Sequence, residues 1–175
     1  MILIISILMS TNKKLTILGI DPGLADTGYG LITVENHNIT LLTYGSIATN
    51  KKDNTASRLI LLEKTLQKII TTYQPSIIGI EQLFFCNNAK TIISVGQARG
   101  VIMLTAAKNK LLIKEFTPLQ VKQGVTGYGQ ADKKQVQQMV KTILNLKQIP
   151  QPDDAADALA IAICAINTNS FSNIK

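Results

Sequence analysis

The sequence contains few residues of the kinds that build thiolate or imidazole sites. Its 175 residues include two Cys and one His. Cys86 and Cys164 lack the spacing of metal ligands and the placement of a disulfide pair, so reduced thiols are expected, with Cys164 as core filler in an apolar helical stretch. His37 falls in the polar turn Glu-Asn-His-Asn, where a solvated side chain is the ordinary outcome. These scarcities argue against a soft-metal centre.

Acidic residues are scarce as well. The chain has 11 of them against 18 basic residues, which gives a net charge of +7 and a pI near 9.5. A basic chain suits a polyanionic partner such as nucleic acid, although an ordinary solvated basic surface would look the same. With 46% hydrophobic residues, the chain has enough apolar side chains for one compact domain with a sizeable core.

Four of the few acids stand beside segments that otherwise read as core. Asp21 and Glu81 each end an apolar run, and Asp154 and Asp157 open the Ala-rich segment near the C-terminus. A carboxylate held against a core is costly unless it is paired or bound to a metal. Each acid alone has an ordinary explanation, as a turn residue, a surface acid or a helix-start charge. Together they predict a divalent-cation site assembled from distant segments.

Hydrophobic periodicity predicts an α/β fold: a mixed five-stranded sheet with helices on both faces. Short polar connections make the first three strands an antiparallel meander, and a helical crossover allows the first and fourth strands to be parallel neighbours. Asp21 and Glu81 would then project side by side, from strands about 4.8 Å apart. The expected strands are Leu15–Asp21, Gly28–Val34, Ile39–Ile47, Ser76–Glu81 and Leu111–Phe116, and the expected helices are Thr55–Thr72, Ala89–Lys108, a short one around Pro118–Gln123, Asp132–Leu144 and a last one opening at Asp153 or Asp154.

The last helix supplies the remaining acids. Asp154 and Asp157 are i,i+3 neighbours on a face that continues through Ile161 and Cys164, so they are expected on the core side. Asp153 is expected to cap the helix. Since Asp153 and Asp157 are also helical neighbours, at i,i+4, spacing alone leaves the choice of pair open.

The chain ends are expected to lie outside the domain. Residues 1–14 form an N-terminal extension of uncertain status, 15–168 a single domain, and 169–175 a tail. The apolar run at residues 1–9 is far shorter than the roughly 20 residues that span a bilayer, and it lacks the basic start and cleavage site of an export signal. A cytoplasmic protein without membrane attachment is expected.

A series of motifs resembles the RuvC family of Holliday-junction resolvases. The similarity runs from about Leu15 to Ile166, in order and at matching separations. Its last block, which opens at Asp154, is the sharpest. The motifs are Leu18-Gly-Ile-Asp-Pro-Gly23, Thr27-Gly-Tyr-Gly30, Ile80-Glu-Gln-Leu-Phe84, Gly96-Gln-Ala-Arg-Gly100, Val121-Lys-Gln123, Gln135-Val-Gln137 and Asp154-Ala-Ala-Asp-Ala-Leu-Ala160.

The resemblance implies an RNase H-like fold and a magnesium-dependent endonuclease that makes paired symmetric nicks in four-way DNA junctions during recombination and repair. It implies two Mg²⁺ per site, with Mn²⁺ as a possible substitute, a homodimer, and a branch-migration helicase of the RuvA and RuvB type as partner. By matched position, the catalytic and metal-binding acids are Asp21, Glu81, Asp154 and Asp157.

The resemblance also assigns residues that contact DNA. Phe84 matches an aromatic near the junction bases, and Lys122 and Lys133 match DNA-contacting lysines, with Lys134 able to share the second role.

The helix expected at Ala89–Lys108 has more apolar positions than one core-facing stripe requires, among them Ile93 and Ile102, so its surplus face is expected at a dimer contact.

Three other functions fit parts of the pattern. The chain could be another RNase H-like nuclease that acts on RNA, or a junction-binding protein without catalytic activity. The presence of all four acids disfavours the second of these. A sugar-kinase or actin-like ATPase begins with a similar acid-glycine strand turn, but that fold usually duplicates its core, and 175 residues hold one copy.

Overall fold

The strands of the protein form one mixed sheet. The structure is a computed structural model that describes residues 14–36, 38–82 and 89–167. The strand order is β3-β2-β1-β4-β5, with β1 antiparallel to β2 and parallel to β4. The strands are β1 (Leu15–Asp21), β2 (Asp26–Glu35), β3 (Asn38–Ala48), β4 (Ile77–Glu81) and β5 (Leu112–Phe116).

Helices begin where the sequence supplies capping groups. The side chain of Asn54 accepts the backbone N–H of Ser57 at the start of α2, and Thr117 and Asp132 each open a capping box, at the starts of α4 and α5. The described helices are α2 (Thr55–Tyr73), α3 (Ala89–Lys108), α4 (Pro118–Thr126), α5 (Lys133–Ile143) and α6 (Asp153–Asn167).

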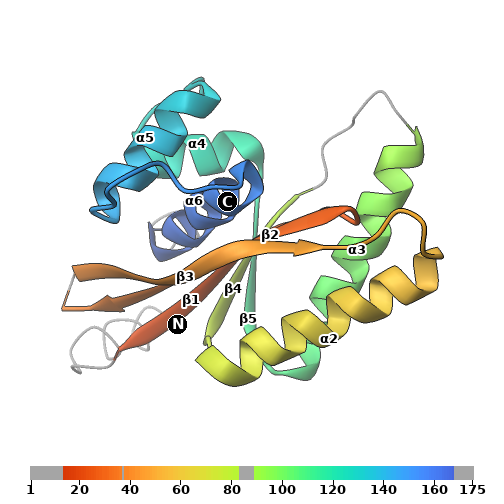
Figure 1. Ribbon diagram of the computed structural model, residues 1–175. Helices are drawn as coiled ribbons and strands as arrows, with labels where there is room; N and C mark the ends of the chain where they lie inside the picture. The colour runs from red at the N-terminus through yellow and green to blue at the C-terminus, as the bar shows by residue number, and fades with distance from the viewer. Residues whose placement is uncertain (1–13, 37, 83–88, 168–175) are drawn as a thin grey trace, which may run out of the picture.

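The sheet separates two hydrophobic cores. The side chains of α2 and α3 pack on one face around Leu18 and Ile80, and those of α4, α5 and α6 pack on the other around Ile17 and Phe116 (Figure 1). This arrangement confirms the predicted fold class, a mixed five-stranded sheet with helices on both faces.

The predicted elements lie within two residues of the observed ones at nearly every end. The exception is α4, which continues to Thr126 rather than stopping near Gln123. Gly124 lies inside this helix because the backbone there packs on α6: a Cβ built on Gly124 would lie 2.8 Å from the Cys164 sulfur. Cys164 itself is buried and forms no disulfide, as predicted. His37 and Cys86 lie outside the described residues.

Glycines in β1 and β2 let α6 lie directly on the sheet. A Cβ built on Gly19 would come within 2.0 Å of the Ala158 carbonyl oxygen, and one built on Gly28 within 2.0 Å of the Asp154 carbonyl oxygen. Side chains larger than hydrogen would therefore push the helix away from the strands. Within the described residues, no helix is long and apolar enough to cross a membrane.

Candidate active site

Asp21 and Glu81 lie at the same end of two parallel neighbouring strands. The printed register pairs Ile20 of β1 with Ile80 of β4, so the next residues along the two strands are the two acids. Gly19 and Gly79, two residues before them, both face α6, since a Cβ on either would meet atoms of that helix. Because strand side chains alternate, Asp21 and Glu81 project on the α6 side of the sheet as well.

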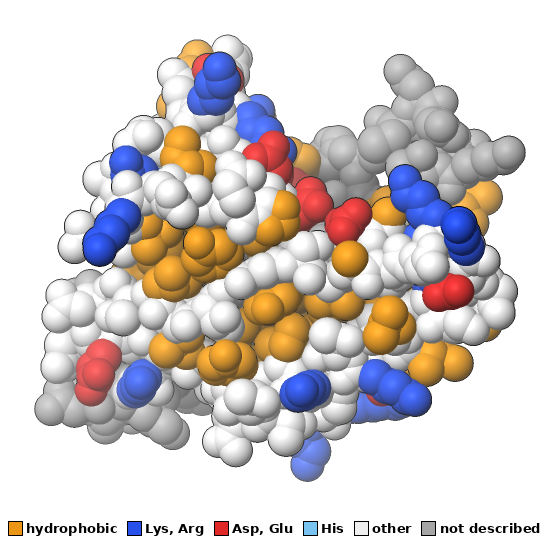
Figure 2. Space-filling view, viewed as in Figure 1, with side chains coloured by type: hydrophobic (Ala, Val, Ile, Leu, Met, Phe, Trp, Pro, Cys, Tyr) orange, Lys and Arg blue, Asp and Glu red, His pale blue; other side chains and the backbone are white. Residues whose placement is uncertain are grey.

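The N-terminal end of α6 brings the other two acids, Asp154 and Asp157, to this place. Gly28 of β2 is the register partner of Asp21, and the backbone of Asp154 lies against it. Asp154 and Asp157 are partly buried, whereas Asp153 is exposed. Figure 2 shows acidic side chains gathered where the α4–α6 layer meets the sheet.

The four acids affect one another electrostatically. The pKa of Asp21 is raised from 3.8 to about 7, chiefly by burial and then by the charges of Glu81, Asp157 and Asp154. Burial also raises the pKa of Glu81, with a further contribution from Asp157. Asp153 is not among the charges that act on Asp21. The structure thus groups Asp21 with Asp154 and Asp157 rather than with Asp153.

Lys133 is the cation nearest these carboxylates. Its amine lies 3.1 Å from a carboxylate oxygen of Asp157 and 3.2 Å from one of Asp153. Burial raises the pKa of Asp157, and the hydrogen bond and charge of Lys133 oppose that rise. For Lys133, burial would lower the pKa, but its bonds to the two aspartates raise it overall. Lys133 therefore stands at the edge of the acid cluster, at the first residue of α5.

The expectation that Asp153 caps α6 is wrong. The helix begins at Asp153, and the carbonyl oxygen of the preceding residue, Pro152, accepts the backbone N–H groups of Ala155 and Ala156. The Asp153 carboxylate instead accepts a hydrogen bond from the Gln137 side chain and pairs with Lys133. Sequence spacing could not show this, because it depends on how α5 packs on α6.

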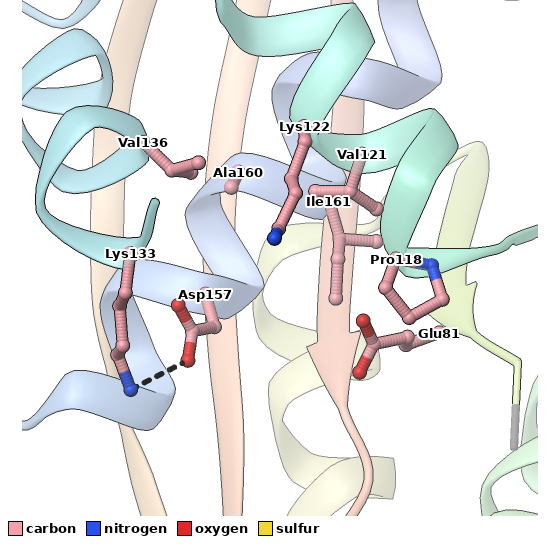
Figure 3. A pocket seen from close by; sticks show the side chains of 9 residues that line it. All are labelled: Glu81, Pro118, Val121, Lys122, Lys133, Val136, Asp157, Ala160 and Ile161. Atoms are coloured by element: carbon pink, nitrogen blue, oxygen red, sulfur yellow. Dashed lines mark ion pairs between the residues drawn. The ribbon is translucent and has the colours of Figure 1, made fainter. Parts of the chain in front are cut away.

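A cavity of about 210 Å³ opens between α4, α5, α6 and the end of β4. Figure 3 shows the carboxylates of Glu81 and Asp157 reaching it from opposite sides and the Lys122 side chain extending toward it from α4. Apart from these three residues and Lys133, its wall is apolar. The lining residues are Glu81, Pro118, Val121, Lys122, Lys133, Val136, Asp157, Ala160 and Ile161.

The donor chemistry of this place suits a hard divalent cation. Four carboxylates supply oxygen ligands, and an Asp whose pKa lies near 7 would gain from a positive ion beside it. In the part of the chain that the structure describes, no three Asp, Glu, His or Cys side chains stand close enough to hold a metal as they are. The Lys133 amine pairs with Asp157 in this arrangement. Binding a metal ion would require the carboxylate side chains to adopt rotamers that bring their oxygens closer together.

The remaining predicted site residues divide into three cases. Lys122 lines the cavity beside the acids. Lys134 is exposed on α5, next to Lys133. Phe84 lies outside the described residues. Of the four predicted DNA contacts, the structure therefore brings Lys122 and Lys133 to the cavity.

Comparison with known proteins identifies the family to which the chain belongs. A family model described as "Crossover junction endodeoxyribonuclease RuvC" matches residues 17–165, which include all four acids. The chain belongs to the RuvC family. A curated RuvC crossover junction endodeoxyribonuclease from Alkaliphilus oremlandii is 54% identical over 158 residues, covering 90% of this chain and 96% of that one.

Solved structures agree with this RuvC assignment. The Thermus thermophilus RuvC in complex with Holliday junction substrate superposes with a TM-score of 0.82 at 30% identity, covering 86% of this chain and 92% of that one. The yeast mitochondrial Holliday junction resolvase Ydc2, at 14% identity and a TM-score of 0.63, shares the fold.

Two contributors to the RuvC site were missed from the sequence. Gly28 lies in the Thr27–Gly30 motif opposite Asp21, and the motif signalled it without showing that α6 rests there. Arg99 lies in the Gly96–Gly100 motif, and its side chain donates a hydrogen bond to the Glu81 backbone carbonyl.

Proposed function

We propose that this RuvC-family chain is a metal-dependent endonuclease that resolves four-way DNA junctions by paired symmetric nicks during recombination and repair. The observation that carries the proposal is the meeting of acids from β1, β4 and α6 at one end of the sheet, on one face. The basic net charge of +7 around this acidic site suits a substrate made of phosphates.

The four acids would divide the work of holding metal ions. Asp21, on the central strand β1, would hold metal together with the other three acids, whose charges all act on it. Glu81 and Asp157 would each hold one side, and Asp154 would complete a ligand shell or orient a water molecule. Asp153 is left out because its side chain is exposed, its charge is not among those that act on Asp21, and its carboxylate accepts a hydrogen bond from Gln137.

Magnesium is the proposed metal, with two ions per site and Mn²⁺ able to substitute. Two such ions, when bound, make a water molecule nucleophilic and stabilise the leaving 3′ oxygen of the phosphodiester. The carboxylates would set the positions of both reacting oxygens, and the apolar wall formed by Pro118, Val121 and Ile161 would limit the access of bulk water.

The lysines beside the site would hold the DNA backbone. Lys122 extends toward the cavity from α4, and Lys133 lies at its edge. The two lysines would bind phosphates on either side of the scissile bond. A phosphate oxygen would compete with Asp153 and Asp157 for the Lys133 amine. Lys134 would share this role, and Phe84 would stack on an unpaired junction base.

Two nicks in symmetry-related strands require two active sites, so we infer a homodimer with a two-fold axis. The exposed face of α3 supports this inference, since Ile93 is 63% exposed and Leu104 57% exposed, and the two lie three helical turns apart. Ile102, the other candidate position on this helix, is buried and cannot take part. A helicase of the RuvA and RuvB type as partner and a cytoplasmic location are proposed together with this function.

Cleavage of a synthetic four-way junction tests the proposal. Mg²⁺ should produce two symmetric nicks, and EDTA should leave binding without cleavage. Asp21→Asn, Glu81→Gln and Asp157→Asn should each abolish cleavage and preserve binding, because the amide removes ligand charge while the lysines remain. Asp53→Asn, on an acid in the turn before α2, is the matched control and should cleave normally.

The rival functions give different results in the same experiment. Preferential cleavage of an RNA–DNA hybrid would indicate an RNA-directed nuclease, and junction binding without cleavage in either Mg²⁺ or Mn²⁺ would indicate a silent binding protein. If any of the three acid variants cuts junctions at the parent rate, that acid is misassigned.

A further inference from the structure

Arg99 joins α3 to the ends of two strands. Its Nε–H donates a hydrogen bond of 3.2 Å to the backbone carbonyl oxygen of Glu81, the last residue of β4. Its terminal amino group forms an ion pair with the carboxylate of Glu115 in β5. The Arg99 side chain is 16% exposed and that of Glu115 36% exposed, so the guanidinium is mostly buried while its ion pair reaches the surface.

Glu81 needs such support because it stands at the end of the ladder. The register of β4 with β1 runs to the pair Ile20 and Ile80 and stops before Glu81. On the other side, Gln82 donates its backbone N–H to the Phe116 carbonyl oxygen of β5 at 2.8 Å. The Glu81 peptide is therefore held through β5 and α3. The charge of Asp157 acts on the Glu81 carboxylate and repels it.

Arg99 approaches from the opposite side of the sheet. Glu81 projects into the cavity beneath α4 and α6, and α3 packs on the other face (Figures 1 and 3). The groups that shift the Glu81 pKa are its burial and Asp157, and Arg99 is not among them. The guanidinium thus acts on the backbone of Glu81 rather than on the charge of its carboxylate.

We propose that Arg99 is a positioning residue for the nuclease site, which fixes the backbone of Glu81 from behind the sheet, and that Glu115 fixes Arg99 in turn. The inference rests on the proposed metal-binding role of Glu81. A planar guanidinium can serve a carbonyl and a carboxylate at once, whereas a Lys ammonium is a point charge without this fork. Arg99→Lys therefore retains the charge and removes the geometry.

The test compares Arg99→Lys with Arg58→Lys, which alters the other arginine of the chain. Arg58 donates its Nε–H to the Thr49 hydroxyl rather than to the backbone of a site acid, and it serves as the matched control. Three quantities are measured: the single-turnover cleavage rate, the Mg²⁺ concentration that half-saturates the rise in melting temperature, and amide hydrogen exchange at Gln82 in metal-free protein.

Arg99→Lys should cleave about 10- to 100-fold more slowly, as expected when a reacting group moves by up to about 1 Å. It should require more Mg²⁺ for half-saturation, exchange the Gln82 amide faster and bind junctions as tightly as the parent. Glu115→Gln, which leaves Arg99 in place, should show the same changes to a smaller degree, and Arg58→Lys should show none.

The outcomes separate the inference from the proposed function. A parent that never cleaves junctions, but whose Mg²⁺ half-saturation and Gln82 exchange shift in Arg99→Lys alone, supports the positioning role and removes the nuclease proposal. Parent-like values of all three quantities in Arg99→Lys overturn the positioning role. If Arg99→Lys does not fold, parent-like values in Glu115→Gln overturn it instead.

Discussion

Gly28→Ala tests whether the seat of α6 on β2 controls catalysis. The new methyl carbon would lie 2.0 Å from the Asp154 carbonyl oxygen and 2.4 Å from its carbonyl carbon. Real Cβ atoms essentially never approach another heavy atom closer than 3.0 Å, so the gap must open by at least 1.0 Å, which is 3.0 minus 2.0. Both contacts are backbone, and no side-chain rotamer can relieve them.

The movement falls on the part of α6 that carries two of the four acids. Overpacking a well-filled interior costs about 1–3 kcal/mol. For a chain of this size that corresponds to a fall in melting temperature of roughly 2–12 °C. A misplacement of about 1 Å in a catalytic group costs on the order of 100-fold in rate. We therefore expect Gly28→Ala to lower the rate of junction cleavage about 100-fold. The loss of stability alone would not slow cleavage this much, because most of the variant would remain folded.

Single-turnover cleavage, junction binding in EDTA and thermal unfolding together check this prediction. Binding should be preserved, since Lys122 and Lys133 come from α4 and α5. Gly100→Ala is the control for unfolding, because a Cβ there meets nothing within 4 Å. A Gly28→Ala variant with the parent's melting temperature and cleavage rate would refute the contact between α6 and β2 on which the site depends.

Three further results are expected. The pKa of Asp21 is raised to about 7 in the folded chain, so metal-free protein should lose stability as the pH rises from about 4 through 7. At pH 8 without metal, Asp21→Asn should therefore have a higher melting temperature than the parent, and the difference should shrink toward pH 4. Equal melting temperatures at pH 8 would contradict the burial of this acid. Asp153→Asn should cleave almost normally and Asp154→Asn hardly at all, and the reverse result would make Asp153 the metal ligand. In sedimentation, the parent should run near twice 19.0 kDa, Ile93→Glu or Leu104→Glu should shift it toward monomer, and Leu119→Glu, equally exposed on α4 across the sheet, should not; a parent that stays monomeric on the junction yet makes both nicks would exclude the dimer.

The placement of Asp21 and Glu81 could be predicted from the sequence because it follows from local rules. Strand alternation sets the face on which each side chain projects, and a helical crossover between β1 and β4 makes the strands parallel. Two acids that end such strands must meet at one edge. The same reasoning placed Asp154 and Asp157 on one face of α6, since helical periodicity needs no knowledge of neighbouring elements.

The partners of Lys133 and Arg99 could not be predicted in the same way. Lys133 and Asp157 meet only because α5 packs beside α6, and Arg99 reaches Glu81 only because α3 lies across the ends of β4 and β5. These contacts join residues 24 and 18 positions apart through rotamers of long side chains. Hydrophobic periodicity also does not predict which of Ile93 and Ile102 is exposed, because that depends on the rotation of α3 about its axis.

The dependence of the site on α6 also fixes when the protein can first act during its own synthesis. Asp21 and Glu81 are made long before Asp157, which follows Glu81 by 76 residues, or about 4–15 s at 5–20 residues per second. Until Asp154 is added, the growing chain holds two of the four site acids and no helix on the glycines of β1 and β2. On the proposed roles of these acids, a chain without α6 lacks a complete metal site and is not expected to cut the nucleic acid that surrounds it. Cleavage would then begin only once α6 is made and docks on the sheet.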